Sequence, residues 1–328
     1  GISWAPSYRL DLNKDGQGAL AMSCVIKNEL ADLDKTRVFG ISGFPAVQFG
    51  HVASPLDLST TWAAFFSQLA QDPSQRNRNY AIAQQVMMNT AVDRGGASVP
   101  DLSSFKDGLD LHFQDLGRLT LGLGQAAYLP VAEKDVEYER LVEWVIPDNR
   151  DEFGRPYEPR HRSENWDREQ DAVWDAARFA NPFSFPLTTA PVAVREKELF
   201  SGQNMLNWTA PGEKALVRIT RALNVRALHT ESEVQGKRET LSIGGRTFQR
   251  SLVEGTMILK SYRGRQDKVI IRRRFSGRLV EAEGSPEKRL AEGGVFSVNE
   301  RNELVWEVEL APGKETTLKY RYEALVCI

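Results

Sequence analysis

The densest group of potentially catalytic side chains is an acidic stretch between residues 148 and 171, which also contains Tyr157, His161 and Trp166, with Trp174 just beyond it. Glycosidases cleave their substrates with two carboxyl groups, one protonated and one ionised. Arginines from Arg150 to Arg178 are mixed into the stretch. The sequence therefore favours a solvent-exposed face or loop on which these arginines neutralise the acidic side chains. A carbohydrate-active hydrolase is the alternative. The acidic residues are Asp148, Asp151, Glu152, Glu158, Glu164, Asp167, Glu169 and Asp171.

A second charged segment, residues 260–278, holds eight basic residues and one acid, Asp267, together with Tyr262 and Phe275. Basic strands that carry aromatic side chains can bind single-stranded nucleic acid. The residues from Glu281 to Glu309 are rich in glutamate, however, and adjacent antiparallel strands place such side chains opposite each other. The sequence therefore predicts cross-strand ion pairs and no nucleic-acid partner. The basic residues are Lys260, Arg263, Arg265, Lys268, Arg272, Arg273, Arg274 and Arg278.

Metal, cofactor and nucleophile chemistry have no motif in the sequence. A zinc site needs three or four convergent ligands, whereas the histidines are isolated, so we expect surface or loop positions for them. No nucleophile elbow, phosphate-binding loop or dinucleotide fingerprint is present. No catalytic, cofactor-binding or metal-ligating residue is therefore assigned. The histidines are His51, His112, His161 and His229.

Composition narrows the class of protein further. The 328 residues include 42 Lys+Arg and 44 Asp+Glu, a net charge of −2 that gives no overall attraction to nucleic acid or an anionic membrane. The apolar runs are shorter than a membrane-spanning helix requires, so no transmembrane segment is predicted. Cys24 and Cys327 lie near opposite ends of the chain, which favours two free thiols and leaves a disulfide open.

The elements that position these residues are mostly strands. Hydrophobic residues alternate with polar ones from Trp4 to Leu12 and from Leu20 to Ile26, which predicts a hairpin through Asp15-Gly16. Residues 37–41, 118–123, 126–131 and 136–145 are predicted to be further strands. Apolar residues spaced by three and four predict helical insertions at about 57–93 and at 164–179. The first helix of the 57–93 insertion is predicted to begin around Trp62.

The Pro-rich segment 181–186 ends the first part of the chain, because proline disfavours helical dihedrals in the preceding residue. From residue 191 turn residues recur about every ten positions, a spacing typical of antiparallel sandwiches, and Gly244-Gly245 predicts a tight hairpin. We therefore expect a mainly β protein made of two antiparallel β-sandwich-like halves with helical insertions. The predicted domains are residues 1–180 and 181–328.

Several motifs resemble the C-terminal domain of unknown function of the mucoidy-inhibitor A-like bacterial proteins. They are SWAPSYRLDL (3–12), EWVIPD (143–148), FPLTTAP (185–191), FSVN (296–299), LVW (304–306), LAPGKE (310–315) and LKYRY (318–322). The likeness covers most of the chain except roughly 57–115 and 150–178. It implies a β-rich module that follows an N-terminal β domain and a coiled coil in a protein that often carries a secretion signal, and it implies no catalytic residues.

These observations together predict a non-enzymatic scaffold or binding module of a periplasmic, exported or cell-envelope protein, with a protein or envelope component as its partner. Turns and insertions are the expected contact surfaces, because the inner faces of the strands are used for packing. The chain begins at Gly1 without an initiator methionine, which predicts that it is part of a longer protein.

Overall fold

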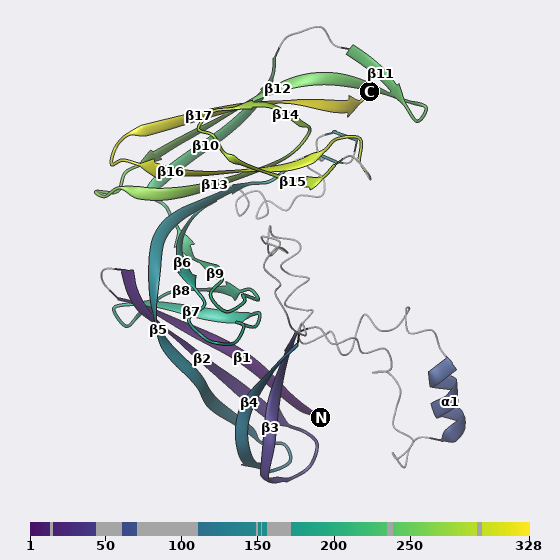
Figure 1. The fold of residues 1–328 in the computed structure, drawn as a ribbon, viewed down its shortest axis with the longest axis vertical. Coiled ribbons are helices and arrows are strands. Elements are labelled where there is room, and N and C mark those ends of the chain that lie inside the picture. Colours follow the sequence, from purple (N-terminus) through teal and green to yellow (C-terminus); the bar gives the residue numbers. More distant parts are fainter. Residues whose placement is uncertain are drawn as a thin grey trace. The chain divides into compact units, whose positions relative to one another are not determined.

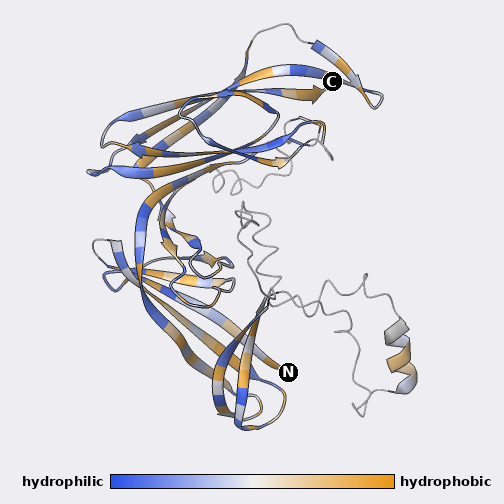
Figure 2. Ribbon diagram, in the orientation of Figure 1, coloured by the Kyte–Doolittle hydropathy of each residue, from blue (hydrophilic) through white to orange (hydrophobic). Residues whose placement is uncertain are grey.

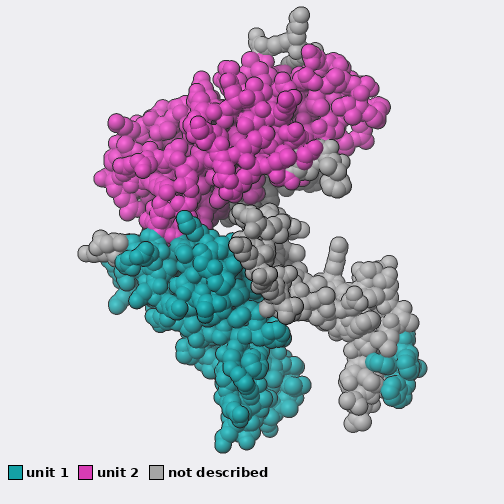
Figure 3. All heavy atoms as spheres, in the orientation of Figure 1, with its two compact units in different colours: residues 1–138, 179–215 teal, residues 139–178, 216–328 magenta. Residues whose placement is uncertain are grey.

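The computed structural model describes residues 1–13, 16–43, 61–70, 111–148, 150–151, 153–155, 172–234, 239–293 and 297–328. The chain divides into two compact units, each made of two separate segments (Figure 3). Unit 1 comprises residues 1–138 and 179–215, and unit 2 comprises residues 139–178 and 216–328. The units do not coincide with the predicted domains 1–180 and 181–328, because residues 139–178 group with the C-terminal part and residues 181–215 with the N-terminal part.

The described part of the chain is mainly β, as predicted, with seventeen strands and one helix (Figure 1). Hydrophobic and hydrophilic residues alternate along many of the strands (Figure 2). The elements are β1 (Ile2–Leu12), β2 (Gln17–Asn28), β3 (Leu33–Gly43), α1 (Trp62–Ala70), β4 (Leu111–Leu121), β5 (Ala126–Ile146), β6 (Val173–Ala180), β7 (Ala190–Glu196), β8 (Leu199–Leu206), β9 (Lys214–Arg221), β10 (Val225–Glu233), β11 (Glu239–Ile243), β12 (Arg246–Ser261), β13 (Asp267–Ser276), β14 (Arg278–Ala282), β15 (Glu287–Glu292), β16 (Arg301–Leu310) and β17 (Glu315–Cys327).

Unit 1 is built on the predicted N-terminal hairpin. Strands β1 and β2 pair antiparallel from Ile2↔Asn28 to Leu12↔Gly18. The other edge of β2 pairs antiparallel with residues 126–137 of β5. Strand β7 joins β1 in parallel, and the backbone N–H of Thr188 just before it donates to the Tyr8 hydroxyl at 2.9 Å. Two of the motifs that carry the family resemblance therefore lie where β1 and β7 meet, SWAPSYRLDL in β1 and FPLTTAP at the start of β7. A separate ribbon of β3 and β4 packs Leu121 against Cys24 and Ile26.

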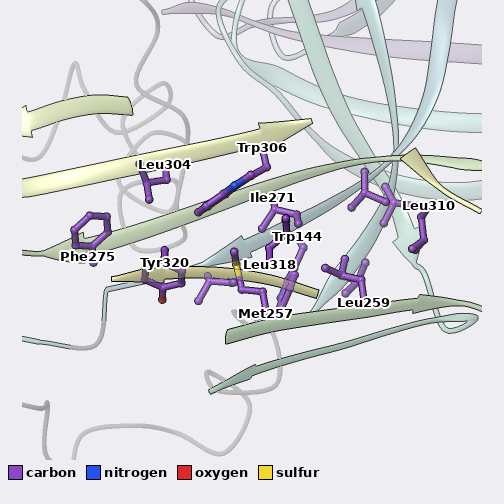
Figure 4. Close-up of a cluster of buried hydrophobic side chains, with 14 of the residues drawn as sticks. Trp144, Met257, Leu259, Ile271, Phe275, Leu304, Trp306, Leu310, Leu318 and Tyr320 are labelled. Carbon is purple, nitrogen blue, oxygen red and sulfur yellow. The ribbon is translucent and has the colours of Figure 1, made fainter. Parts of the chain in front are cut away.

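Unit 2 is a sandwich of two sheets. One sheet contains β15, β16 and β13 next to residues 139–146 of β5, and the other has the order β10-β12-β17-β14, with β11 paired to β12. Trp144, Ile271 and Trp306 from the first sheet pack against Met257 and Tyr320 from the second (Figure 4). The predicted hairpin at Gly244-Gly245 is confirmed, since these glycines have φ of 58° and 75° between Ile243 and Arg246.

The pairings are not all antiparallel, because β1–β7 and β5–β13 are parallel. The two strands predicted at 126–131 and 136–145 are one continuous strand, β5. The helix predicted at 164–179 is wrong over its described part, where β6 runs from residue 173. Val173, Asp175, Ala177 and Phe179 are all buried, which is a strand periodicity that a buried aspartate and small alanines conceal in the sequence.

The other predicted insertion, about 57–93, is helical over Trp62–Ala70, and its remaining residues, including the second helical segment at 78–92, lie outside the described residues. Residues 156–171 of the acidic stretch also lie outside them. Among the described helices, none has the length and apolarity to cross a bilayer.

Candidate functional site

The most unusual side chain in unit 2 is a buried arginine. Arg273 lies on β13 with a side chain only 2% exposed, in the alternating series Val269, Ile271, Arg273, Phe275 that faces the core. Its Nη2 donates to Glu231 Oε1 at 2.6 Å, its Nε donates to the Tyr320 hydroxyl at 2.6 Å, and its Nη1 donates to the Pro147 carbonyl. Because a buried charge is costly unless it is paired and hydrogen-bonded, these contacts define a specific polar site within the core.

The site, here called the Arg273 cluster, brings together side chains from three strands. His229 and Glu231 come from β10, Arg273 from β13, and Tyr320 and Tyr322 from β17. The Tyr320 hydroxyl donates to Glu231 Oε1 at 2.7 Å and accepts from Arg273 Nε. It also lies 2.8 Å from His229 Nε2. Since its single proton goes to Glu231, His229 Nε2 must carry a hydrogen and donate to it.

A glycine allows Tyr320 to reach Glu231. Gly255 of β12 pairs with Glu231 on one side and with Tyr320 on the other. A Cβ at Gly255 would lie 2.2 Å from Tyr320 Cζ and 2.5 Å from its hydroxyl oxygen. The phenol ring therefore lies across β12 at the one strand position that has no side chain, which places the hydroxyl beside β10.

The charges of the cluster follow from these contacts. Burial alone would raise the pKa of Glu231, but the Arg273 guanidinium and the Tyr320 hydroxyl together outweigh burial and lower it, so Glu231 is ionised. Burial raises the pKa of Tyr322 to about 12 and that of Tyr320 still further. Burial acts to lower the pKa of Arg273, yet its anionic and phenolic neighbours leave it raised. The cluster thus holds one fixed ion pair and protonated phenols rather than a group ready for proton transfer at neutral pH.

His229 corrects a sequence prediction, because it is a largely buried member of the cluster and not a surface histidine. Burial is the main cause of a pKa lowered to about 4, and the Arg273 charge adds to it while Glu231 opposes it. The neutral histidine therefore stabilises the fold fully above its unfolded pKa of 6.5, and this contribution is lost as the pH falls from 6.5 towards 4.

Acidification from pH 7.5 to 4.5 should therefore lower the free energy of unfolding by about 2–3 kcal/mol more in the wild type than in His229→Gln, whose amide can still donate to Tyr320. Urea unfolding followed by tryptophan fluorescence at both pH values measures the difference. His112→Asn on β4 controls for loss of a histidine in unit 1. Equal losses in the wild type and His229→Gln would show that His229 takes up its proton in the folded state.

A pocket of about 300 Å³ adjoins the cluster at Glu231. Arg150 lines it and also donates to the Gly154 carbonyl at 2.9 Å. The pocket therefore combines charged, amide, hydroxyl and aliphatic groups at one place. Its lining residues are Arg150, Glu231, Ser232, Glu233, Gln249, Ser251, Val253 and Val326.

The other basic residues of the 260–278 segment are largely used in ion pairs, as predicted. Arg274 contacts Glu303, its direct cross-strand partner, at 3.0 Å, and Lys268 contacts Glu307 at 3.1 Å. Further partners include Glu139 and Glu143 of β5 and Asp175 of β6, which the sequence did not foresee, as well as Asp267 of β13 and Glu303 of β16. These further pairs are Lys268–Glu139, Arg263–Asp175, Arg263–Asp267, Arg265–Asp267, Arg272–Glu143 and Arg272–Glu303.

Asp148 and Asp151 are the acidic residues of the 148–171 stretch that lie within the described residues. Asp148 accepts from Ser276 Oγ at 2.5 Å and from the Arg150 backbone N–H, and burial raises its pKa. Asp151 accepts from the backbone N–H groups of Phe153 and Arg155. Neither carboxylate lines the pocket. Glu152 and Glu158 to Asp171 lie outside the described residues.

The remaining predictions about single residues concern thiols, metals and histidines. Cys24 and Cys327 are free, and Cys24 is buried, as favoured by the sequence. The described residues contain no group of three histidine, cysteine, aspartate or glutamate side chains placed to hold a metal ion. His112 lies on β4 and stacks on Phe185, whereas His51 and His161 lie outside the described residues.

Sequence reasoning did not identify the Arg273 cluster, although one signal was present. Arg273 shares the parity of Val269, Ile271 and Phe275, and Tyr320 shares that of Leu318, so charged and phenolic groups were predictable on buried faces. Their meeting with Glu231 depends on strand order, which alternation does not specify. Comparison with known proteins found no matching family model, no matching curated protein and no matching solved structure.

Proposed function

We propose that this protein is a non-enzymatic scaffold or binding module. The observation that carries the proposal is the pairing of three largely buried carboxyl side chains with arginines. Glu231 is held by Arg273 at 2.6 Å, Glu143 by Arg218 at 2.6 Å, and Asp175 by Arg140 at 2.6 Å. Catalytic acids and bases work at pKa values set near their operating pH, whereas an arginine beside a carboxylate keeps it ionised. Such pairs hold the fold in one arrangement and do not take part in proton transfer.

A location in the bacterial cell envelope or the exported space belongs to the same proposal. Its support is the resemblance of the SWAPSYRLDL, EWVIPD and LKYRY motifs to the mucoidy-inhibitor A-like family. The partner is then a protein or another envelope component. Nucleic acid is not proposed as a partner, because basic residues of the 260–278 segment form ion pairs with neighbouring acids such as Glu303 and Glu307.

One observation favours the alternative, a carbohydrate-active hydrolase. The pKa of Asp148 is raised by burial, as a general acid in glycoside cleavage requires. Asp148 is however bonded to Ser276 Oγ and does not line the pocket, and of the two glutamates that do line it, Glu231 has a lowered pKa. The hydrolase therefore ranks second.

A cleavage assay and a binding assay test the proposal together. The full chain and Asp148→Asn are incubated with a panel of polysaccharides and with peptidoglycan, and released reducing ends are measured. We expect no release above background from either protein. We also expect the full chain to sediment with an insoluble envelope fraction at high salt, where attraction between exposed charges is screened. Cleavage that is lost in Asp148→Asn would instead establish the hydrolase.

A further inference from the structure

We infer that the pocket beside Glu231 binds a neutral, hydroxyl-rich ligand the size of one sugar ring. This inference rests on the proposed binding function and names the chemical class that the pocket recognises. Its volume of about 300 Å³ lies at the lower end of the range for small-molecule sites, roughly 300–1,000 Å³. A single ring with its substituents fits this size.

The hydrogen-bonding groups of the pocket match hydroxyl groups. A hydroxyl donates one hydrogen bond and accepts two. Arg150 can only donate, Glu231 and Glu233 when ionised can only accept, and the Gln249 amide does both. Ser251 adds a hydroxyl, and the planar Gln249 amide can contact two adjacent hydroxyls at once. Polyhydroxylated molecules present such adjacent pairs.

The charge balance favours a neutral ligand over an ionic one. Glu231 is already compensated by Arg273 at 2.6 Å, and the lining contains the positive charge of Arg150 as well as the negative charge of Glu233. An anion or a cation would lose its hydration without meeting a net opposite charge, which is costly. A neutral polyol loses hydrogen bonds to water and regains them from the lining groups.

The pocket is also held in place before any ligand arrives. Glu231 Oε1 accepts from Arg273 Nη2 and from the Tyr320 hydroxyl at 2.6 and 2.7 Å, and the Tyr322 hydroxyl lies 3.3 Å from each carboxylate oxygen. Arg150 is bonded to the Gly154 carbonyl. Fixing these side chains in the free protein reduces the entropy lost on binding. The partly exposed Val326 supplies aliphatic surface for the C–H groups of a ring.

The test is a titration of the full chain with glucose, galactose, mannose and N-acetylglucosamine, followed by saturation-transfer NMR. Glycine and inorganic phosphate are the zwitterionic and anionic comparators. Gln249→Leu keeps the approximate volume of the side chain and removes its amide, and it should raise the sugar Kd about tenfold. Gln203→Ala, an exposed position on β8 in unit 1, should leave the Kd unchanged.

Each outcome separates the ligand class from the proposed function. Sugar binding that weakens in Gln249→Leu alone, without cleavage of glycosides, supports both. Cleavage of a bound glycoside would overturn the non-enzymatic proposal and leave the ligand class standing. Preference for glycine or phosphate, equal sugar binding by Gln249→Leu, or no sugar binding at all would overturn the ligand class, while envelope sedimentation still tests the binding module.

Discussion

Replacing Arg273 with leucine should lower the free energy of unfolding by about 3–5 kcal/mol, because removal of one partner leaves the other charge buried and uncompensated. The guanidinium is 2% exposed and bonds Glu231, Tyr320 and the Pro147 carbonyl. Leucine fills much of the aliphatic volume but supplies no donor. Urea unfolding of the wild type and the variant, with the change followed by tryptophan fluorescence, measures the loss.

The neighbouring residue provides the matched control. Arg274 is a partly exposed arginine on the same strand, paired with Glu303 at 3.0 Å, and Arg274→Leu should cost only about 0–1 kcal/mol. The double variant Arg273→Leu/Glu231→Leu should recover part of the stability, since it leaves no unpaired charge. If Arg273→Leu costs no more than Arg274→Leu, the buried ion pair is not the organising contact of the sandwich core.

Adding a single methyl group at Gly255 should destabilise unit 2 by about 2–4 kcal/mol through overpacking and the loss of hydrogen bonds. The new Cβ would stand 2.2 Å from Tyr320 Cζ, so the ring must move. The Tyr320 hydroxyl then gives up its contacts with Glu231, Arg273 and His229. Thermal unfolding of Gly255→Ala and the wild type by calorimetry measures the effect.

Gly264→Ala is the matched control for this substitution, because a Cβ there meets no atom within 4 Å. It should change stability by less than about 0.5 kcal/mol. In a Tyr320→Leu background, where the ring is absent, Gly255→Ala should cost much less than in the wild type. An undiminished cost in that background would mean that the glycine is required for backbone reasons and not for the ring.

The sequence predicted well those features that depend on local alternation. The hairpin of β1 and β2, the tight turn at Gly244-Gly245 and the mainly β class all follow from period-two patterns and turn residues, and the structure confirms them. Strand β6 was mistaken for a helix because Asp175 is a buried polar residue whose partner, Arg140, lies 35 positions away in the chain. A local pattern does not reveal such a partner.

The site was less predictable than the fold, because it depends on which strands become neighbours. Glu231, Arg273 and Tyr320 are separated by more than 40 residues from one another, and they meet only because β12 lies between β10 and β17 in one sheet while β13 lies in the other. The basic 260–278 segment drew attention as a charged surface. The residue of this segment that belongs to the candidate site is instead Arg273, whose side chain is buried.

Strand β17, residues 315–327, lies between β12 and β14 in the second sheet of unit 2. During synthesis the ribosome delivers this strand almost last within the described chain, after both of its neighbours have emerged. Until then β12 and β14 have no shared partner in the sheet. The second sheet of unit 2 therefore cannot close around β17 until residues 315–327 have been made.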